Sequence, residues 1–162
     1  MIYILSENIR TGKTTALLNW TKTQKDCDGI LCPDDAFGKR YFLQIKTKKE
    51  VEFEVETDGG TIIKIGTFRF LKSAFQKAND YLIASAEKRD CHYLIIDELG
   101  KLELKNQGLH FSALKLIPKY AYDKKHHLIL VVRASLLNEI IKHYNISQYS
   151  VIKKEALEQI NY

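Results

Sequence analysis

The chain has 162 residues, 45% of them hydrophobic, so it can bury a core of its own. Its formal net charge of +5 favours polyanions such as nucleotides, but no arginine-rich or aromatic-interleaved basic motif argues for specific nucleic-acid reading. No apolar run approaches the ~20 residues of a membrane span, and the N-terminus lacks a basic region followed by a long apolar stretch. We therefore expect a cytoplasmic protein with a single domain over residues 1–162.

Cysteine usage favours a reducing compartment. Cys27, Cys32 and Cys91 are odd in number and show none of the CxxC pairing usual in zinc or redox sites. We expect buried free thiols. A zinc site that combines them with His92 is a disfavoured alternative, because Cys91 and His92 are adjacent and would seldom both point at one ion.

The chain begins with a strand, a loop and a helix. Residues 2–5 form an apolar run that predicts a strand, and residues 16–20 predict a helix from Gly12 or Lys13 to about Gln24. A loop here that ends in Gly-Lys-Thr-Thr is typical of a phosphate-binding loop, because the glycine allows a tight turn, the helix start carries partial positive charge and the lysine reaches the outer phosphates. The residues expected to bind phosphate are Asn8, Ile9, Arg10, Thr11, Gly12, Lys13, Thr14 and Thr15, with the Thr14 hydroxyl also on a magnesium ion (Mg2+).

One position departs from the full pattern GxxxxGK[ST]. Counted back from Gly12, the pattern requires a glycine where this chain has Glu7. A carboxylate there could repel phosphate or point outward, and its side chain restricts backbone angles that glycine adopts freely. The loop alone therefore leaves an alternative, an ordinary strand-to-helix turn in which Lys13 is solvated and Thr14 caps the helix.

Residues 28–66 show a different pattern. Apolar and polar residues alternate with period two between turn-forming segments, which is typical of antiparallel strands with one solvated face. We therefore predict an antiparallel β-meander inserted at about residues 28–66. Its strand segments are 29–31, 40–45, 51–55 and 61–65, separated by turns at 33–35, 47–49 and 58–60.

The rest of the chain alternates helices with buried strands. Unbroken apolar runs at 93–96 and 128–132 are typical of strands buried on both faces, which usually lie in parallel sheets. This alternation predicts a three-layer α/β domain with a mainly parallel sheet. The expected helices cover 71–88, 109 to about 117 or beyond with Pro118 ending or kinking it, a segment capped by Ser135 that carries Leu136 to Ile141, and 155–160. A short strand is expected near 149–151.

Two acidic residues follow the buried strand at 93–96. In magnesium-dependent chemistry on nucleoside triphosphates, a carboxylate at a strand end holds the metal ion opposite the hydroxyl of the phosphate loop, a role that suits Asp97. Glu98 could orient or deprotonate the water that attacks the γ-phosphorus. Ligands of such domains lie at the C-terminal ends of the strands, where residues 6–14, Asp97 and Arg133 are all expected. The alternative is that the acidic pair only ends a strand and begins a turn.

The block IIDELGKLEL, residues 95–104, resembles the DEIGKMEL-type signature of a known family. This family is the small P-loop nucleoside-triphosphatases described from hyperthermophiles, whose animal members are called cancer-related nucleoside-triphosphatases. Looser similarity extends from residue 2 to about residue 133, and it includes Gly38-Lys39-Arg40 ahead of a β run and the segment from Phe70 to Ala78.

The resemblance implies a RecA-like P-loop fold and slow, magnesium-dependent hydrolysis of ATP, GTP or other nucleoside triphosphates with broad base tolerance. By position, residues 12–15 match the family's phosphate loop, Asp97 its magnesium carboxylate and Glu98 its catalytic base. The family usually has glycines where this chain has Glu7 and Arg10.

Three arginines are candidates for stabilising charge at the γ-phosphate. Arg133 follows a buried strand and has the best position for sensing that group. Arg10 adds positive charge beside the phosphates and could act on the developing charge, and Arg40 could reach over the site from the meander. For each, a solvated or ion-paired surface arginine is the alternative. We name Glu98, Lys13 and Arg133 as the candidate catalytic residues.

The leading hypothesis is a nucleoside-triphosphatase that uses Mg2+ and water to cleave the terminal phosphate of ATP or GTP. A small P-loop kinase is an alternative, although Glu98 suits water activation and no arginine-rich lid is evident. A nucleotide-binding regulator with little catalysis is an alternative from a different class, which Glu7 favours. The sequence has no NKxD-like segment and therefore gives no reason to prefer guanine.

Overall fold

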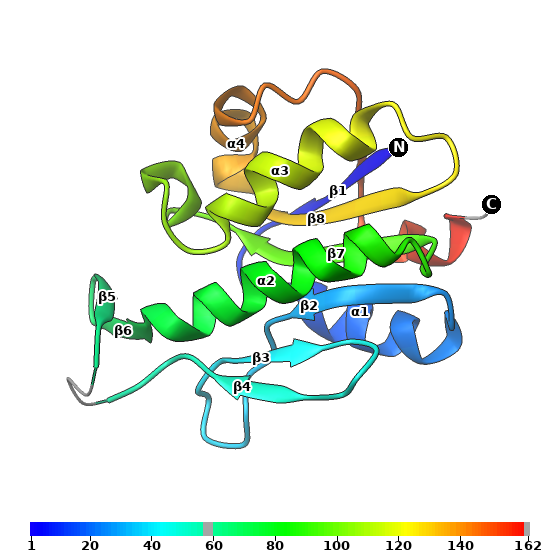
Figure 1. The fold of residues 1–162 in the computed structure, drawn as a ribbon. Helices are drawn as coiled ribbons and strands as arrows, with labels where there is room; N and C mark the ends of the chain where they lie inside the picture. The colour runs from blue at the N-terminus through cyan, green and yellow to red at the C-terminus, as the bar shows by residue number, and fades with distance from the viewer. Residues whose placement is uncertain (57–59, 161–162) are drawn as a thin grey trace.

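The computed structural model describes residues 1–56 and 60–160. Its centre is a seven-stranded sheet with the strand order β4-β3-β2-β7-β8-β1-β9, and a second sheet pairs β5 with β6 (Figure 1). The strands are β1 (Ile2–Glu7), β2 (Cys27–Leu31), β3 (Tyr41–Gln44), β4 (Glu50–Glu52), β5 (Ile62–Ile65), β6 (Phe68–Leu71), β7 (Tyr93–Leu99), β8 (His127–Arg133) and β9 (Ser150–Ile152). The α-helices are α1 (Lys13–Thr23), α2 (Lys72–Lys88), α3 (His110–Ala121) and α4 (Leu137–His143), and the 3-10 helices are η1 (Glu103–Lys105), η2 (Ala134–Leu136) and η3 (Lys154–Gln159).

Five adjacent strands of the large sheet, β2, β7, β8, β1 and β9, are parallel. The apolar runs of β7 and β8 are buried along their length, as their unbroken sequence predicts. Parallel strands end at the same edge of a sheet, and in this register Glu7 lies opposite Arg133. The ends of β1, β7 and β8 therefore bring the loop at 6–14 and residues 97–98 to the same edge as Arg133.

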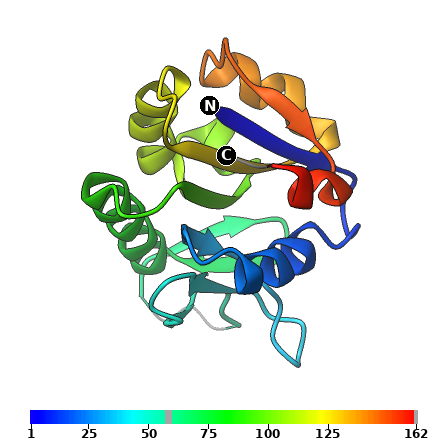
Figure 2. The same ribbon diagram turned by 90° about the vertical axis from the view of Figure 1, so that its right-hand side faces the viewer.

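Alternate residues of the central strands face two separate apolar cores. Leu94 and Ile96 of β7 pack in the core that contains the buried faces of α2 and α3, whereas Tyr93 and Ile95 pack in the core that contains Trp20 of α1. Figure 1 shows α2 and α3 in front of the sheet and α1 behind it, and Figure 2 shows the layers from the side. The three-layer α/β fold with a mainly parallel sheet is confirmed.

The predicted meander is divided between the two sheets. β2, β3 and β4 form an antiparallel run, but β2 is also a parallel partner of β7 and so belongs to the centre of the fold. The segment predicted at 61–65 does not extend this run, because it forms β5 and pairs with β6, a strand that was not predicted. Residues 68–71 lead directly into α2, so no turn signal in the sequence separates them from that helix and marks them as a separate strand. Of the predicted turn at 58–60, residues 58 and 59 lie outside the described residues.

Two helix ends are decided by the structure. The helix expected across 109 to about 117, with Pro118 ending or kinking it, continues through Pro118 to Ala121. A proline inside a helix removes one hydrogen bond, here to the carbonyl of Leu114, and Leu114 is exposed, so water can replace the missing donor. Ser135 does not cap the next helix, because η2 intervenes and α4 begins after Leu136 without a side-chain cap. The predicted last helix is present as the 3-10 helix η3.

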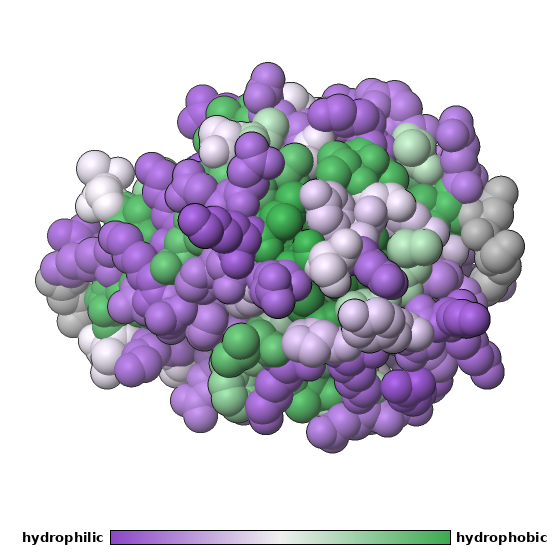
Figure 3. All heavy atoms as spheres, turned by 90° about the horizontal axis from the view of Figure 1, so that it is seen from above, coloured by the Kyte–Doolittle hydropathy of each residue, from purple (hydrophilic) through white to green (hydrophobic). Residues whose placement is uncertain are grey.

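The surface is mixed in character. Seen from above, hydrophilic side chains surround the apolar ones that reach the surface (Figure 3). The large apolar side chains that remain exposed include Phe37, Phe111 and Tyr122. Across residues 1–56 and 60–160, no helix combines the length and apolar content that crossing a bilayer requires.

Gly29 allows β2 to lie against β7. Its φ is +125°, and an added Cβ would collide with the backbone of Ile95. We expect Gly29→Ala to lower the free energy of unfolding by at least about 3 kcal/mol, because neither strand can move away inside a packed sheet. Gly38→Ala is the matched control, since Gly38 also has a positive φ, +78°, but open space around it; a loss of about 1 kcal/mol is expected there. Urea unfolding measures both changes, and equal losses would contradict the close approach.

Candidate functional site

The loop between β1 and α1 leads into a helix start that is open to a ligand. Gly12 adopts a left-handed conformation, and its carbonyl accepts the first helical hydrogen bond from Ala16 N at 2.9 Å. No side chain caps this helix, so the N–H groups of its first turn, where Thr15 is exposed, can face an anion. Thr11 Oγ1 donates to the Asn8 carbonyl at 3.0 Å and stabilises the loop.

Arg10 occupies a backbone conformation that glycine adopts more easily. Its φ is +60°, in the left-handed region, where an L side chain costs roughly 1 kcal/mol. Ile9 and Arg10 are both exposed, so the Arg10 side chain lies in solvent beside the loop. The loop therefore keeps a glycine-like backbone at this position without a glycine.

The Lys13 side chain is buried against the loop that precedes α1. The residue is 7% exposed, and its ammonium donates to the Asn8 carbonyl at 2.8 Å and the Glu7 carbonyl at 3.4 Å. Both acceptors are main-chain oxygens of the same loop. A solvated Lys13, the alternative left open by the sequence, is therefore wrong.

Thr14 and Asp97 are in direct contact although they are far apart in the sequence. Thr14 Oγ1 donates to Asp97 Oδ2 at 2.8 Å, and the Cys32 N–H donates to the same oxygen at 3.1 Å. Burial of this carboxylate, together with the charge of Glu98, raises the pKa of Asp97 to about 6, even though the two hydrogen bonds and Lys13 act to lower it. The structure thus brings the end of the loop and the first acidic residue to one point.

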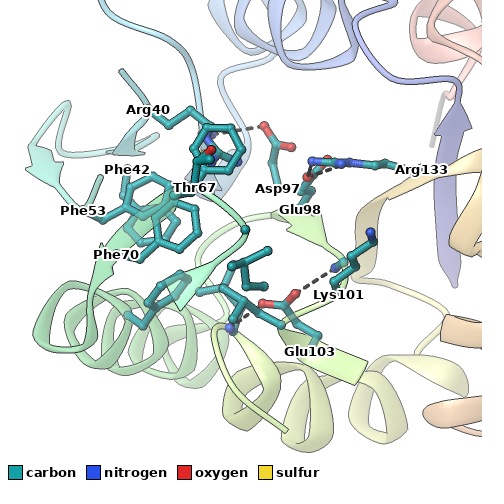
Figure 4. Close-up of a pocket in the computed structure, with 18 residues that line it drawn as sticks. Arg40, Phe42, Phe53, Thr67, Phe70, Asp97, Glu98, Lys101, Glu103 and Arg133 are labelled. Atoms are coloured by element: carbon teal, nitrogen blue, oxygen red, sulfur yellow. Dashed lines mark hydrogen bonds and ion pairs between the residues drawn. The ribbon is translucent and has the colours of Figure 1, made fainter. Parts of the chain in front are cut away.

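Glu98 and Arg133 form an ion pair across the ends of β7 and β8. Arg133 donates to Glu98 Oε1 from Nε at 3.1 Å and from Nη2 at 2.6 Å. The two side chains remain partly exposed, at 30% for Arg133 and 26% for Glu98. Figure 4 shows Glu98 beside Asp97, with Arg133 reaching it from the neighbouring strand. The structure therefore brings these candidate catalytic residues together, paired with each other.

Lys154 pairs with Glu7, and this residue was not expected from the sequence. The Lys154 N–H donates to Glu7 Oε1 at 2.8 Å, and its ammonium lies 3.4 Å from Oε2 and 2.8 Å from the Thr11 carbonyl. Burial alone would raise the pKa of Glu7, but the contacts with Lys154 lower it. Lys153 Nζ donates to the Ser6 carbonyl at 2.7 Å. The contact arises because β9 is parallel to β1, so the two lysines after β9 reach the edge where the loop begins, a pairing with no local signal in the sequence.

Glu103 is another buried acid that was not expected at the site. Its Oε2 accepts the Gly100 N–H and its Oε1 accepts the Leu109 N–H, both at 2.7 Å. Burial raises the pKa of Glu103 to about 7, although these backbone hydrogen bonds lower it. Glu103 fixes both ends of the segment that follows Glu98, and its signal in the sequence was its place within the block 95–104 that resembles the family signature.

A cavity of about 450 Å³ lies beside the acidic pair. Asp97, Glu98 and Arg133 line one end of it, whereas none of residues 6–15, all of which the structure describes, lines it. Arg40 and a group of phenylalanines line the other end (Figure 4). These phenylalanines are Phe42, Phe53, Phe68, Phe70 and Phe75.

The cysteines do not assemble a metal site. Cys27 and Cys91 are buried and Cys32 is half-buried, and all three are free thiols. Burial raises the pKa of Cys27 and of Cys91 to about 12, so both stay protonated. Within the described part of the chain, no three histidine, cysteine or acidic side chains are grouped as metal ligands, and the zinc alternative with His92 gains no support.

Asp97 gives a stability prediction for the protein free of metal and nucleotide. Its pKa is about 6 in the fold against an ordinary 3.8, so the folded state binds the proton more tightly and loses stability as the pH rises through this interval. Asp97→Asn keeps an oxygen for Thr14 and Cys32 without the charge. We expect it to raise the free energy of unfolding at pH 7.5 by on the order of 1–3 kcal/mol, and by much less at pH 4.5.

Urea unfolding in the presence of EDTA at the two pH values measures this effect. Asp80→Asn, on the exposed face of α2, is the control and should change stability by less than about 0.5 kcal/mol. An Asp97→Asn protein less stable than the wild type at pH 7.5 would contradict the prediction.

Comparisons with known proteins agree on one family and one fold. A protein-family model described as NTPase matches residues 3–160. Among solved structures, the chain is similar to the crystal structure of THEP1 from the hyperthermophile Aquifex aeolicus, with a TM-score of 0.73 and 17% sequence identity over 99% of this chain and 97% of that chain. No curated protein sequence matches the chain. The structural likeness supports the P-loop fold, and the family match spans nearly the whole sequence, so the chain belongs to the NTPase family of small P-loop proteins.

Proposed function

We propose that this protein is a magnesium-dependent nucleoside-triphosphatase that hydrolyses ATP, GTP or other nucleoside triphosphates to the diphosphate and phosphate. The observation that carries the proposal is the contact between Thr14 Oγ1 and Asp97 Oδ2 at 2.8 Å. One oxygen comes from the helix after the phosphate loop and the other from a strand tip, which is the arrangement that a magnesium-triphosphate site requires.

The electrostatics of the loop support triphosphate binding. The start of α1 has no side-chain cap, and the Lys13 ammonium lies over the loop on the Asn8 carbonyl. A bound phosphate would offer Lys13 a charged acceptor in place of that neutral carbonyl, and charge-assisted hydrogen bonds are the stronger kind. Glu7 adds little repulsion, because Lys154 pairs with its carboxylate.

Thr14 and Asp97 fit a magnesium ion. Both supply hard oxygen ligands, and the raised pKa of Asp97 marks a buried carboxylate whose charge the surrounding groups do not fully offset. These two residues would hold the ion together with phosphate oxygens. When bound, the ion neutralises charge on the β- and γ-phosphates.

Glu98 is the proposed acceptor of the proton from the attacking water. As the water oxygen bonds to the γ-phosphorus, the bond from that phosphorus to the β-bridging oxygen breaks, the diphosphate leaves and a water proton passes to the carboxylate. Arg133 binds Glu98 Oε1 and leaves Oε2 for the water. We assign Arg133 the role of orienting Glu98 and of placing positive charge near the γ-phosphate.

Broad base tolerance is part of the proposal because the family resemblance implies it, and the sequence has no NKxD-like segment that would give a reason to prefer guanine. A nucleotide-binding module with little catalysis is the alternative from a different class. The observation that favours it is the ion pair with Arg133, which occupies one oxygen of Glu98.

Two substitutions separate hydrolysis from binding. Lys13→Ala should lower both triphosphate affinity and hydrolysis by at least about 100-fold, because it removes the ammonium that lies on the Asn8 carbonyl, where a bound phosphate would offer a charged acceptor. Glu98→Gln should slow hydrolysis on the order of 100-fold while affinity stays within about threefold, because the amide can still accept from Arg133 but cannot take a proton. Phosphate release from Mg-ATP and Mg-GTP measures the first quantity, and calorimetric titration with a non-hydrolysable triphosphate measures the second.

The exposed Lys22 of α1 and Glu87 of α2 provide matched controls as Lys22→Ala and Glu87→Gln, which should behave as the wild type. Hydrolysis that survives Lys13→Ala would exclude the proposed site. Nucleotide binding without phosphate release above background, unaffected by Glu98→Gln, would instead support the binding module.

The pairing of Glu7 with Lys154 gives a test by charge removal. Lys154→Met leaves the Glu7 carboxylate uncompensated beside the bound phosphates, and we expect triphosphate affinity to fall about tenfold. Glu7→Gln alone should bind at least as tightly as the wild type, and the double variant should return to the affinity of the wild type. Lys124→Met, which removes the same charge from the loop before β8, is the control. Unchanged affinity in Lys154→Met would show that Glu7 does not act on the phosphates.

A further inference from the structure

The cavity beside Asp97 and Glu98 is larger than hydrolysis needs, since a single water would suffice there. Its volume of about 450 Å³ lies within the ~300–1,000 Å³ range of small-molecule pockets. One end is polar and includes the two acidic residues and Arg133, and the other is aromatic. Figure 4 shows the phenylalanines and the acidic pair on opposite sides of this space.

The aromatic end consists of flat surfaces. Phe53 stacks on Phe42 with ring centroids 4.1 Å apart and on Phe70 at 5.3 Å. Phe68 lies nearly parallel to Phe70 at 6.1 Å and is 47% exposed. The Arg40 guanidinium lies 4.7 Å from the Phe68 centroid and 4.9 Å from the Phe70 centroid. Phe42, Phe53 and Phe70 are buried, so the flat groups that an occupant would meet are the Phe68 ring and the Arg40 guanidinium. Both favour a flat heteroaromatic ring as the occupant.

The two arginines of the cavity are already paired. Arg40 binds Glu54 at 2.8 Å, and Arg133 binds Glu98 at 2.6 Å. Lys101 and Glu103 also line the cavity, so its three cationic and three acidic side chains carry no formal net charge. An anionic occupant would have to compete with the paired carboxylates and would also face Asp97. The charges therefore favour a neutral molecule whose hydroxyl groups can donate to carboxylate oxygens.

The polar end adjoins the proposed triphosphate, and the aromatic end extends away from it. Asp97 is bonded to Thr14 at the start of α1, whereas residues 6–15 do not line the cavity. An occupant with its ring against the phenylalanines would thus carry its hydroxyl groups toward Glu98. A nucleoside combines these properties, because it has a flat base at one end, ribose hydroxyls at the other and no charge.

We propose that this cavity binds a nucleoside and that one of its hydroxyl groups accepts the γ-phosphoryl group of the triphosphate. The inference rests on the proposed function, because the phosphate loop supplies the donor. The hydroxyl oxygen bonds to the γ-phosphorus, the bond from that phosphorus to the β-bridging oxygen breaks, the nucleoside diphosphate leaves and the hydroxyl proton passes to Glu98. Water takes the same place when the cavity is empty, and hydrolysis results.

Binding is tested on the whole protein without triphosphate. Calorimetric titrations with adenosine, guanosine, cytidine and uridine should show saturable binding of at least one, and ribose alone should not bind. Thr67, exposed in the turn between β5 and β6, lines the cavity, so the indole of Thr67→Trp would fill it and weaken binding at least tenfold. Phe68→Ala, which removes a half-exposed ring, should weaken it as well. Phe111→Ala is the matched control, since Phe111 is 50% exposed and lies outside this cavity.

Transfer is tested by product ratios. Hydrolysis releases one phosphate per diphosphate, whereas transfer to the nucleoside lowers that ratio below one and puts the labelled γ-phosphate on the nucleoside. A ratio that stays at one with saturating nucleoside would overturn the acceptor role. The absence of nucleoside binding would overturn the site. A second result would also overturn it: if Thr67→Trp lost affinity for a non-hydrolysable ATP analogue as strongly as for nucleoside, the cavity would hold the base of the triphosphate.

Lys13→Ala separates this inference from the proposed function. That variant should keep nucleoside binding while it loses triphosphate binding. Phosphate release that does not depend on Lys13 would contradict the proposed function. The nucleoside titrations test the cavity independently of that result.

Discussion

The hydrogen bond from Thr14 Oγ1 to Asp97 Oδ2, 2.8 Å long, joins the two halves of the candidate site. It connects the first turn of α1 to the tip of β7, although β8 lies between β7 and the strand that precedes α1. The contact is possible because parallel strands end at one edge and because the helix starts directly after Gly12. The contact requires the Asp97 carboxylate to be buried, and burial disfavours its charged form, as the raised pKa of Asp97 indicates.

Paired charges organise the rest of this edge. Glu7 is bound by Lys154, and Glu98 is bound by Arg133, so these two carboxylates near the loop each have a cationic partner, whereas Asp97 accepts hydrogen bonds from Thr14 and Cys32. The pairing explains how the loop tolerates an acid where the family usually has glycine. In the adjoining cavity both arginines are likewise engaged, Arg133 with Glu98 and Arg40 with Glu54, and the half-exposed Phe68 offers an aromatic surface.

Local patterns predicted much of the fold. The helix expected from Gly12 or Lys13 to about Gln24 is observed as Lys13–Thr23, and the apolar runs at 93–96 and 128–132 are the buried parallel strands. These elements were readable because hydrophobic periodicity and burial on both faces leave a signal within a few residues. β6 was not predicted, because its pairing with β5 depends on neighbours outside the segment itself. The helix after Ser135 was predicted, but its cap was not, because η2 comes before α4 begins at Leu137.

By itself, the sequence determined the strand-loop-helix unit that carries Lys13, the acidic pair at a strand end and the layered α/β class, since each depends on residues that are adjacent in the chain. Only the tertiary structure decided that Glu7 pairs with Lys154, 147 positions away, and that phenylalanines from three separate segments form one cavity beside Glu98. Contacts of this kind depend on which strands become neighbours in the sheet, and no local pattern of residues encodes that choice.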